Sequence, residues 1–160
     1  MLKLYKYDED ILRYHEAWVN SGTLYEHWGV VGERGETRQH PLMKDANEDT
    51  AILEVLRQPA EAGFRPIEMG DHAALLIEYA VVGFGDQDDL AKRHALEDRM
   101  NETLGWTALG ACDGGSSGSD SMEVCCLVVD YEMAKRVITA DLAGTEFSDY
   151  RRIFNPADES

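Results

Sequence analysis

The sequence contains no apolar run long enough to cross a membrane. A membrane-spanning helix needs about 18 or more consecutive apolar residues, and no stretch of this 160-residue chain approaches that length. The N-terminus turns acidic at Asp8, before the hydrophobic core of a secretory signal peptide could form. We therefore expect a cytoplasmic protein with no membrane partner.

Cysteine is scarce, and its spacing does not suit a metal site. The chain has three cysteines, Cys112, Cys125 and Cys126, and no Cys-x-x-Cys motif. Cys125 and Cys126 are adjacent in an apolar run, and neighbouring residues of a strand point to opposite faces, so these two should not share a ligand. The pattern is typical of buried, reduced thiols. We predict neither a metal site nor a cofactor.

Catalytic motifs are also absent. The sequence has no Gly-x-Ser-x-Gly, His-Glu-x-x-His or Walker loop. His15 and His27 could lie on paired strands, each beside a glutamate, but adjacent strand residues face opposite ways, so His15 and Glu16 do not form a dyad by proximity. We assign no catalytic residue, and the chain is more typical of a binding protein than of an enzyme.

Basic residues are few. Lys and Arg total 15 against 31 Asp and Glu, for a formal net charge of −16. Up to Pro66 there are 8 basic and 12 acidic residues, and after it 7 and 19. Such a surface repels phosphate backbones at long range, which disfavours nucleic acid as a partner. The charge favours either simple solubility or a basic protein partner.

The remaining composition fits a folded protein of α+β class. The hydrophobic fraction of 44% is sufficient for a packed core and excludes intrinsic disorder. Residues 2–8, 12–20, 23–31 and 36–41 are predicted strands of an antiparallel meander. A helix is expected after Asp45, with Asp45 as N-cap and Glu48 three residues on, and Pro59 should end or kink it. These elements define a first domain, residues 1–66.

Residues 71–160 are predicted to form a second unit, after a linker with Pro66 and Gly70. Residues 73–82 are almost continuously apolar and predict a central strand covered on both faces. A helix should follow from Asp86 or Asp88 to about Leu104. Strands at 106–112 and 122–129 and a helix from Asp130 to Ala143 complete the pattern. The order β-α-β-β-α is that of a ferredoxin-like unit short of its last strand.

A glycine-rich hairpin in the first domain is the most distinctive stretch. Tyr25 and Trp28-Gly29 lead into Val31-Gly32, and Gly35-Glu36-Thr37 follow. Gly32 and Gly35 bracket a turn that needs residues tolerating positive φ. In amino-acid sequence, residues 1–66 resemble the WGR domain, a small module of poly(ADP-ribose) polymerases and some bacterial proteins. Val30 stands where that family has its arginine.

The resemblance implies a non-catalytic module that contacts broken nucleic-acid ends and relays the contact to a neighbouring domain. At the matching positions, Trp28 would stack on a sugar or base and Gly29 would permit close approach. Arg34 and Arg38 would supply positive charge. Val30 in place of arginine removes a charge-assisted hydrogen bond worth about 1.5–3 kcal/mol. A protein partner on the same face is equally compatible with the resemblance.

Two alternative functions fit other features. The charge after Pro66 and the small α+β build suit an acidic immunity- or inhibitor-type protein that binds a basic protein partner. Alternatively, loops 83–89 and 113–121 follow strands expected to be neighbours and could rim the pocket of a small-molecule enzyme or sensor. A strand follows the second loop and it has no Lys-Ser/Thr, so it does not match a phosphate-binding loop. Its possible site residues are Asp113 and Asp120.

Overall fold

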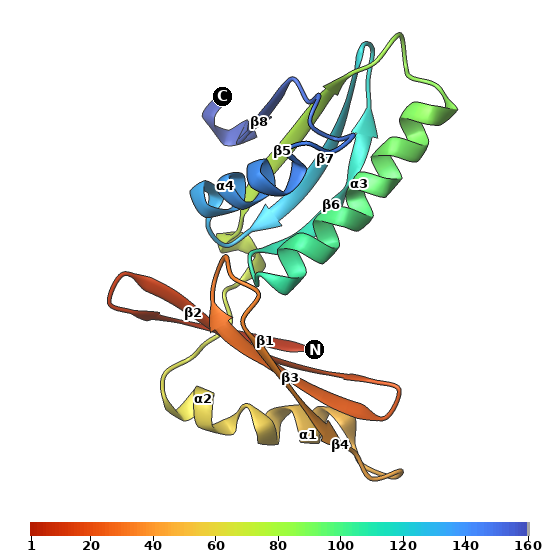
Figure 1. The fold of residues 1–160 in the computed structure, drawn as a ribbon. Helices are drawn as coiled ribbons and strands as arrows, with labels where there is room; N and C mark the ends of the chain where they lie inside the picture. The colour runs from red at the N-terminus through yellow and green to blue at the C-terminus, as the bar shows by residue number, and fades with distance from the viewer. Residues whose placement is uncertain (160) are drawn as a thin grey trace. The chain divides into compact units, whose positions relative to one another are not determined.

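The computed structural model describes residues 1–159 and divides the chain into two compact units. The first unit is Met1–Glu68 and the second begins at Met69. Each contains helices and one four-stranded antiparallel sheet (Figure 1), which confirms the α+β class. The predicted boundaries, 1–66 and 71–160, lie close to these limits. Within residues 1–159 no helix is both long and apolar enough to span a bilayer.

The sheet of the first unit is a simple meander. Its strands run in the order β1-β2-β3-β4, and each pairs antiparallel with the next along the chain. Glu9 and Ser21 take positive φ in the two tight turns that join the first three strands. The strands are β1 (Leu2–Asp8), β2 (Ile11–Asn20), β3 (Thr23–Val30) and β4 (Glu36–Pro41).

Two short helices cover one face of this sheet: α1 (Glu48–Val55) and α2 (Arg57–Glu61). The core between helices and sheet is formed by apolar side chains of both, and includes Leu4, Ala17, Leu24, Ile52 and Leu56. Burial of each leucine or isoleucine side chain contributes roughly 1.5–3 kcal/mol.

The predicted N-cap of the helix was wrong. Asn47 caps α1, with its Oδ1 accepting from the Thr50 amide at 2.9 Å, and Asp45 lies outside the helix. The helix does break before Pro59, at Leu56. Pro59 then sits in the first turn of α2, where a backbone N–H would have no partner within the helix, so its missing donor costs nothing there.

The first unit closes on its own first strand. The backbone amide of Tyr5 donates to Arg65 and the amide of Arg65 donates back to Tyr5, both at 2.8 Å. Phe64, the preceding residue, packs against the core. The chain is therefore tied to β1 immediately before it leaves for the second unit.

The second unit has the element order β-α-β-β-α-β, one strand more than the sequence predicted, and the ferredoxin-like arrangement stays a prediction. Its sheet runs in the order β6-β7-β5-β8 with every pair antiparallel. Short 3₁₀ helices lie at Met69–Asp71 and Pro156–Glu159. The elements are β5 (Ala73–Ala80), α3 (Gln87–Trp106), β6 (Gly110–Ser117), β7 (Ser121–Val128), α4 (Tyr131–Leu142) and β8 (Arg152–Phe154).

Two predictions for this unit were wrong. The strand predicted at 106–112 begins later: α3 extends to Trp106, whose indole donates to Glu102 one turn earlier at 3.1 Å, and β6 begins only at Gly110. The strand at 73–82 is not covered equally on both faces. It ends at Ala80 and alternates, with Leu75, Ile77 and Tyr79 buried and the residues between them half-buried.

The buried face of this sheet meets both long helices. α3 contacts β6, β7 and α4, and α4 also contacts β5. Arg99 of α3 donates through Nε to the Asp141 carboxylate of α4 at 2.8 Å, and Thr103 donates to the same carboxylate at 3.1 Å. The helices fill the core with Leu96, Met100, Leu104, Ala134, Ile138 and Leu142.

Candidate functional site

The glycines of the hairpin allow the chain to fold back on itself. The turn after β3 brings Gly35 against β3, and a Cβ built on Gly29 would lie 2.8 Å from the Gly35 Cα and 3.2 Å from the Tyr14 hydroxyl. A Cβ on Gly35, which has φ +65°, would overlap the Trp28 carbonyl and the same hydroxyl. The space that Gly29 leaves is thus filled by the protein's own chain, where the sequence suggested room for a ligand.

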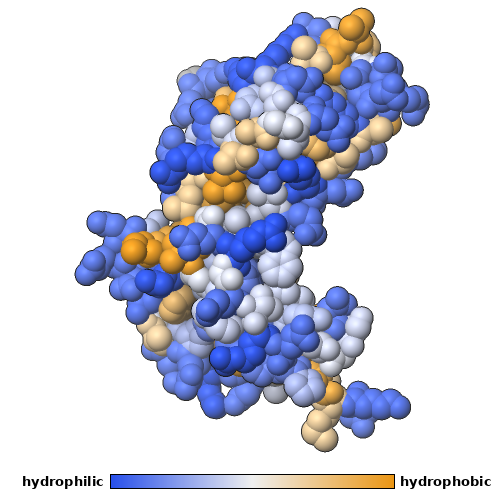
Figure 2. All heavy atoms as spheres, in the orientation of Figure 1, coloured by the Kyte–Doolittle hydropathy of each residue, from blue (hydrophilic) through white to orange (hydrophobic). Residues whose placement is uncertain are grey.

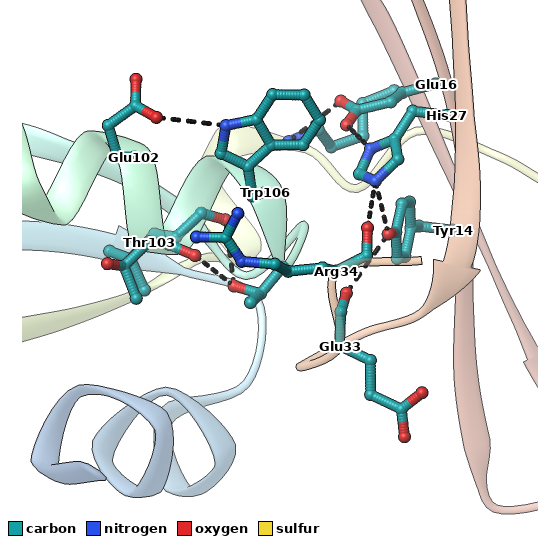
Figure 3. A network of polar contacts seen from close by, with 11 residues as sticks. Tyr14, Glu16, His27, Glu33, Arg34, Glu102, Thr103 and Trp106 are labelled. Carbon is teal, nitrogen blue, oxygen red and sulfur yellow. Dashed lines mark hydrogen bonds and ion pairs between the residues drawn. The ribbon is translucent and has the colours of Figure 1, made fainter. Parts of the chain in front are cut away.

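A buried polar network holds this turn in place. Glu16 and His27 are directly opposed on β2 and β3, and His27 Nδ1 lies 2.7 Å from Glu16 Oε1. His27 Nε2 contacts the Arg34 carbonyl and lies 3.0 Å from the Tyr14 hydroxyl. The Tyr14 hydroxyl donates to the Glu33 carbonyl at 3.3 Å. Figure 3 shows the imidazole of His27 between the Glu16 carboxylate and the turn.

The partners of His27 determine where its protons lie. The Arg34 carbonyl can only accept, so Nε2 carries a hydrogen, and Nδ1 shares a hydrogen bond with the Glu16 carboxyl group. His27 and Glu16 thus form a buried hydrogen-bonded pair that spans the two strands. Lys3 Nζ lies 3.3 Å from the second oxygen of Glu16 and places a positive charge beside it. Burial, followed by the negative charge of Glu16, raises the pKa of Tyr14.

The series Tyr14, His27 and Glu16 has the order of a nucleophile, base and orienting acid. Its geometry does not serve that chemistry. The Nε2 of His27 donates to a backbone carbonyl and has no lone pair with which to take a proton from Tyr14. All three side chains are buried. The network is therefore structural and fixes the turn that follows β3.

A second histidine–carboxylate cluster lies on the opposite face of the sheet. Glu26 accepts from His15 at 2.8 Å through one oxygen and from His40 at 2.9 Å through the other. Burial alone would raise the pKa of Glu26, but the hydrogen bonds from His40 and His15 outweigh it and lower that pKa. Glu26 is thus held as a carboxylate between two histidines.

Trp28 lies beside this cluster and is half-buried. Its ring stacks on His15, with 5.7 Å between the centroids, and the Arg38 guanidinium carbon lies 5.3 Å from the Trp28 ring. The structure therefore brings two of the predicted binding residues together, Trp28 and Arg38. Arg34 lies in the turn, where its backbone carbonyl belongs to the buried network and its side chain is exposed.

The two predicted loops of the second unit do lie side by side. The Asp120 amide donates to the Gly83 carbonyl at 2.6 Å, and the Val81 amide donates to the Asp120 carbonyl at 3.1 Å. A hollow of about 420 Å³ borders them, and it is lined by Val81, residues 84–87, Asp89, Leu90 and Ser117. Asp113 is the extra residue of a bulge inside β6, whereas Asp120 forms the turn to β7, so the two carboxylates are far apart along the hairpin.

Among residues 1–159 no group of three or more His, Cys, Asp or Glu side chains is placed to hold a metal ion. The first of these loops also carries exposed apolar side chains. Val82 is 94% exposed and Phe84 is 76% exposed. We call Val82 and Phe84, with the neighbouring Asp86, Asp88 and Asp120, the loop patch. Figure 2 shows orange atoms bordered by blue at the end of the second unit where the β5–α3 loop lies.

Sequence reasoning missed the pairing of Glu16 with His27 and of Glu26 with His15. The signal was present, because a two-residue turn at Ser21-Gly22 sets the register that opposes Glu16 to His27. Comparison of the chain with family models, with curated proteins and with solved structures finds no match. The resemblance of residues 1–66 to the WGR domain therefore stays a prediction.

Proposed function

We propose that this chain is a non-catalytic binding protein whose second unit recognises a basic protein partner through the loop patch. The observation that carries the proposal is the exposure of two large apolar side chains, Val82 and Phe84, in a loop that also carries the exposed Asp86 and Asp88. Exposed apolar side chains of this size gathered in one place are characteristic of interaction sites.

The charge around the patch suits a cationic partner. Asp88 and Asp120 are exposed, and neither forms an ion pair with another residue in the range 1–159. The chain after Pro66 carries 19 acidic and 7 basic residues. Such an excess steers a basic partner toward the surface and disfavours acidic competitors.

The loop that presents the two apolar groups is held in one conformation. Gly83 and Gly85 take φ values of +61° and +85°, and the Gly85 amide donates to the Val82 carbonyl at 3.1 Å. Asp86 and Asp89 then form a reciprocal capping box at the start of α3, with hydrogen bonds of 2.9 and 3.0 Å. A preorganised loop loses less conformational entropy on binding than a mobile one.

Selection from a random peptide library displayed on phage tests the proposal with a defined probe. The wild-type chain is the target, and a Val82→Ser/Phe84→Ser variant is used for counter-selection. We expect enriched peptides in which lysine or arginine flanks an apolar residue, with binding that weakens as salt is raised. A matched control is Met43→Ser in the first unit, because Met43 is also 85% exposed.

Any one of three results would contradict the proposal. These are no enrichment of peptides over an unrelated target protein, enriched peptides of acidic character, or peptides that bind the double variant as tightly as the wild type. The Met43→Ser control should bind the selected peptides like the wild type. Both variants alter exposed side chains, so circular dichroism should show unchanged folds.

A second candidate concerns the first unit. The resemblance to the WGR domain suggests contact with nucleic-acid ends, and the observation that favours it is the pairing of the half-buried Trp28 ring with the Arg38 guanidinium. Against it stand Val30 at the family's arginine position, the filled space at Gly29 and the net charge of −16. A direct binding measurement separates the two candidates.

A further inference from the structure

Two of the three cysteines face each other inside the second unit. Cys112 on β6 and Cys126 on β7 are directly opposed in the antiparallel ladder. Cys126 belongs to the buried face of β7, together with Met122, Val124 and Val128. Opposed residues of an antiparallel pair point to the same face, so the Cys112 thiol also points toward the helix-covered interior.

Their backbone spacing suits a covalent bond. Directly opposed residues of antiparallel strands have Cα atoms about 4.5–5.5 Å apart, and disulfides join Cα atoms about 4.4–6.8 Å apart. The ladder has a bulge between Cys112 and Gly114, immediately beside the pair. Both cysteines are free thiols in this structure.

The surroundings of Cys112 favour its thiolate. The Gly114 amide donates to the Cys112 sulfur at 3.3 Å. The hydrogen bond from the Cys126 thiol lowers the pKa of Cys112 to about 7, with burial opposing and the Gly114 amide reinforcing this effect. The same hydrogen bond, together with burial, raises the pKa of Cys126. Cys112 is half-exposed and Cys126 is buried, so a small oxidant meets the reactive sulfur first.

We propose that Cys112 and Cys126 are a redox-active pair, in which Cys112 reacts with a hydroperoxide and Cys126 resolves the product to a reversible disulfide. The Cys112 thiolate attacks one peroxide oxygen, the O–O bond breaks, and the leaving alkoxide takes a proton to become an alcohol or water. Cys112 becomes a sulfenic acid. The Cys126 sulfur then attacks the Cys112 sulfur and displaces hydroxide, which leaves as water with the Cys126 proton.

Cys125 does not take part. It is opposed to Leu76 on β5 and to Gly114 on β6, and it points to the other face of the sheet from Cys126. Burial raises the pKa of its thiol. Cys125 therefore provides an internal control within the same strand.

The experiment oxidises the reduced full chain with hydrogen peroxide and then maps its thiols. After oxidation the protein is denatured, alkylated with N-ethylmaleimide and cleaved with a glutamate-specific protease, which cuts after Glu123 and separates Cys112 from the other two cysteines. We expect oxidation to lower the intact mass by two hydrogens and alkylation to add one maleimide per chain. Proteolysis should then give two fragments joined by a disulfide, which dithiothreitol separates. Cys125→Ser should give the same linked pair, whereas Cys126→Ala should leave a sulfenic acid on Cys112 that dimedone traps.

Other outcomes would overturn the proposal. A linkage through Cys125, oxidation of Cys112 to the sulfinic acid with Cys126 still free, or loss of thiols no faster than in Cys112→Ser would each do so. Mapping of the wild-type chain decides between a Cys112–Cys126 bond and its absence even where a cysteine variant fails to fold.

Discussion

The Nδ1 atom of His27 lies 2.7 Å from Oε1 of Glu16, across the antiparallel pair of β2 and β3. This contact joins residues 11 positions apart in the sequence. It positions the imidazole against the Arg34 carbonyl, so the turn after β3 is held by a buried polar side chain of the sheet.

Removal of Glu16 should destabilise the first unit strongly. Glu16→Gln removes the carboxyl group that contacts the buried His27 and Lys3, and loss of one partner of a buried pair costs about 3–5 kcal/mol. Urea denaturation followed by tryptophan fluorescence measures the free energy of unfolding. The control is Asp8→Asn, which removes the exposed pair with Arg13 and should cost only about 0–1 kcal/mol. Equal losses in the two variants would show that the buried pair of Glu16 with His27 contributes no more than the exposed pair.

Gly35 should tolerate no side chain. Gly35→Ala forces a Cβ into the Trp28 carbonyl and the Tyr14 hydroxyl at a positive φ, and we expect a loss of about 2–4 kcal/mol in the free energy of unfolding. Gly22→Ala is a matched control, because Gly22 has φ +77° and open space around it. Its cost should be the backbone term alone, about 1 kcal/mol. A loss no larger at Gly35 than at Gly22 would contradict the close approach described above.

The Glu26 cluster should give the first unit an acid-dependent stability. The folded pKa of Glu26 is lowered below 4.5, so its contribution is present above that value and is lost as the pH falls through the folded pKa. Glu26→Gln lacks the contribution at every pH. The difference in unfolding free energy between the wild type and Glu26→Gln should therefore be largest near neutral pH and shrink in acid, as measured by urea denaturation across the range. A constant difference would contradict the lowered pKa.

Nucleic acid should bind weakly or not at all. A chain with net charge −16 lacks the phosphate-neutralising surface on which non-specific binding depends. In a mobility-shift assay at low salt, nicked and blunt duplex DNA should not be retarded at about 10 μM protein. Retardation of nicked DNA that Trp28→Ala and Arg38→Ala abolish would instead support the second candidate function.

The reactivity of Cys112 should rise near neutral pH. Its pKa of about 7 implies that the rate of alkylation by iodoacetamide increases about tenfold between pH 6 and pH 8. Glu97 and Asp113 act against this lowering, so neutral substitutions there should move the midpoint down. Mass spectrometry of the fragment ending at Glu123 follows the reaction. A midpoint near the ordinary cysteine value would contradict the stabilisation by Cys126 and Gly114.

Most elements could be predicted from periodicity, because each strand or helix shows its own local pattern. The strands of the first unit and helices α3 and α4 are of this kind. The errors arose where local signals compete. Trp106 and Leu109 are typical of a strand. However, α3 continues to Trp106 and buries Leu104 in the core, and the turn that follows has Ala108 at a positive φ of 55°.

The site could be predicted less well, because it depends on which residues face each other across strands. The sequence singled out Trp28 and Arg38, which do meet. The sequence analysis did not pair His27 with Glu16, because these two residues face each other only through the register of β2 with β3. The Cys112–Cys126 pair needed both a register and a bulge, and neither leaves a mark in composition or spacing.

The three-residue strand β8 shields one side of β5, where Ile153 lies opposite Ile77 and Arg152 bridges Glu78 and Glu159. In a chain shortened by its last ten residues, β5 would become an exposed edge strand with unpaired backbone N–H and C=O groups. Exposed edge strands pair with strands of other molecules. Affinity tags and fluorescent labels should therefore be added after this segment and should not replace it. Protein that has been cleaved by a protease near Tyr150 should aggregate during storage.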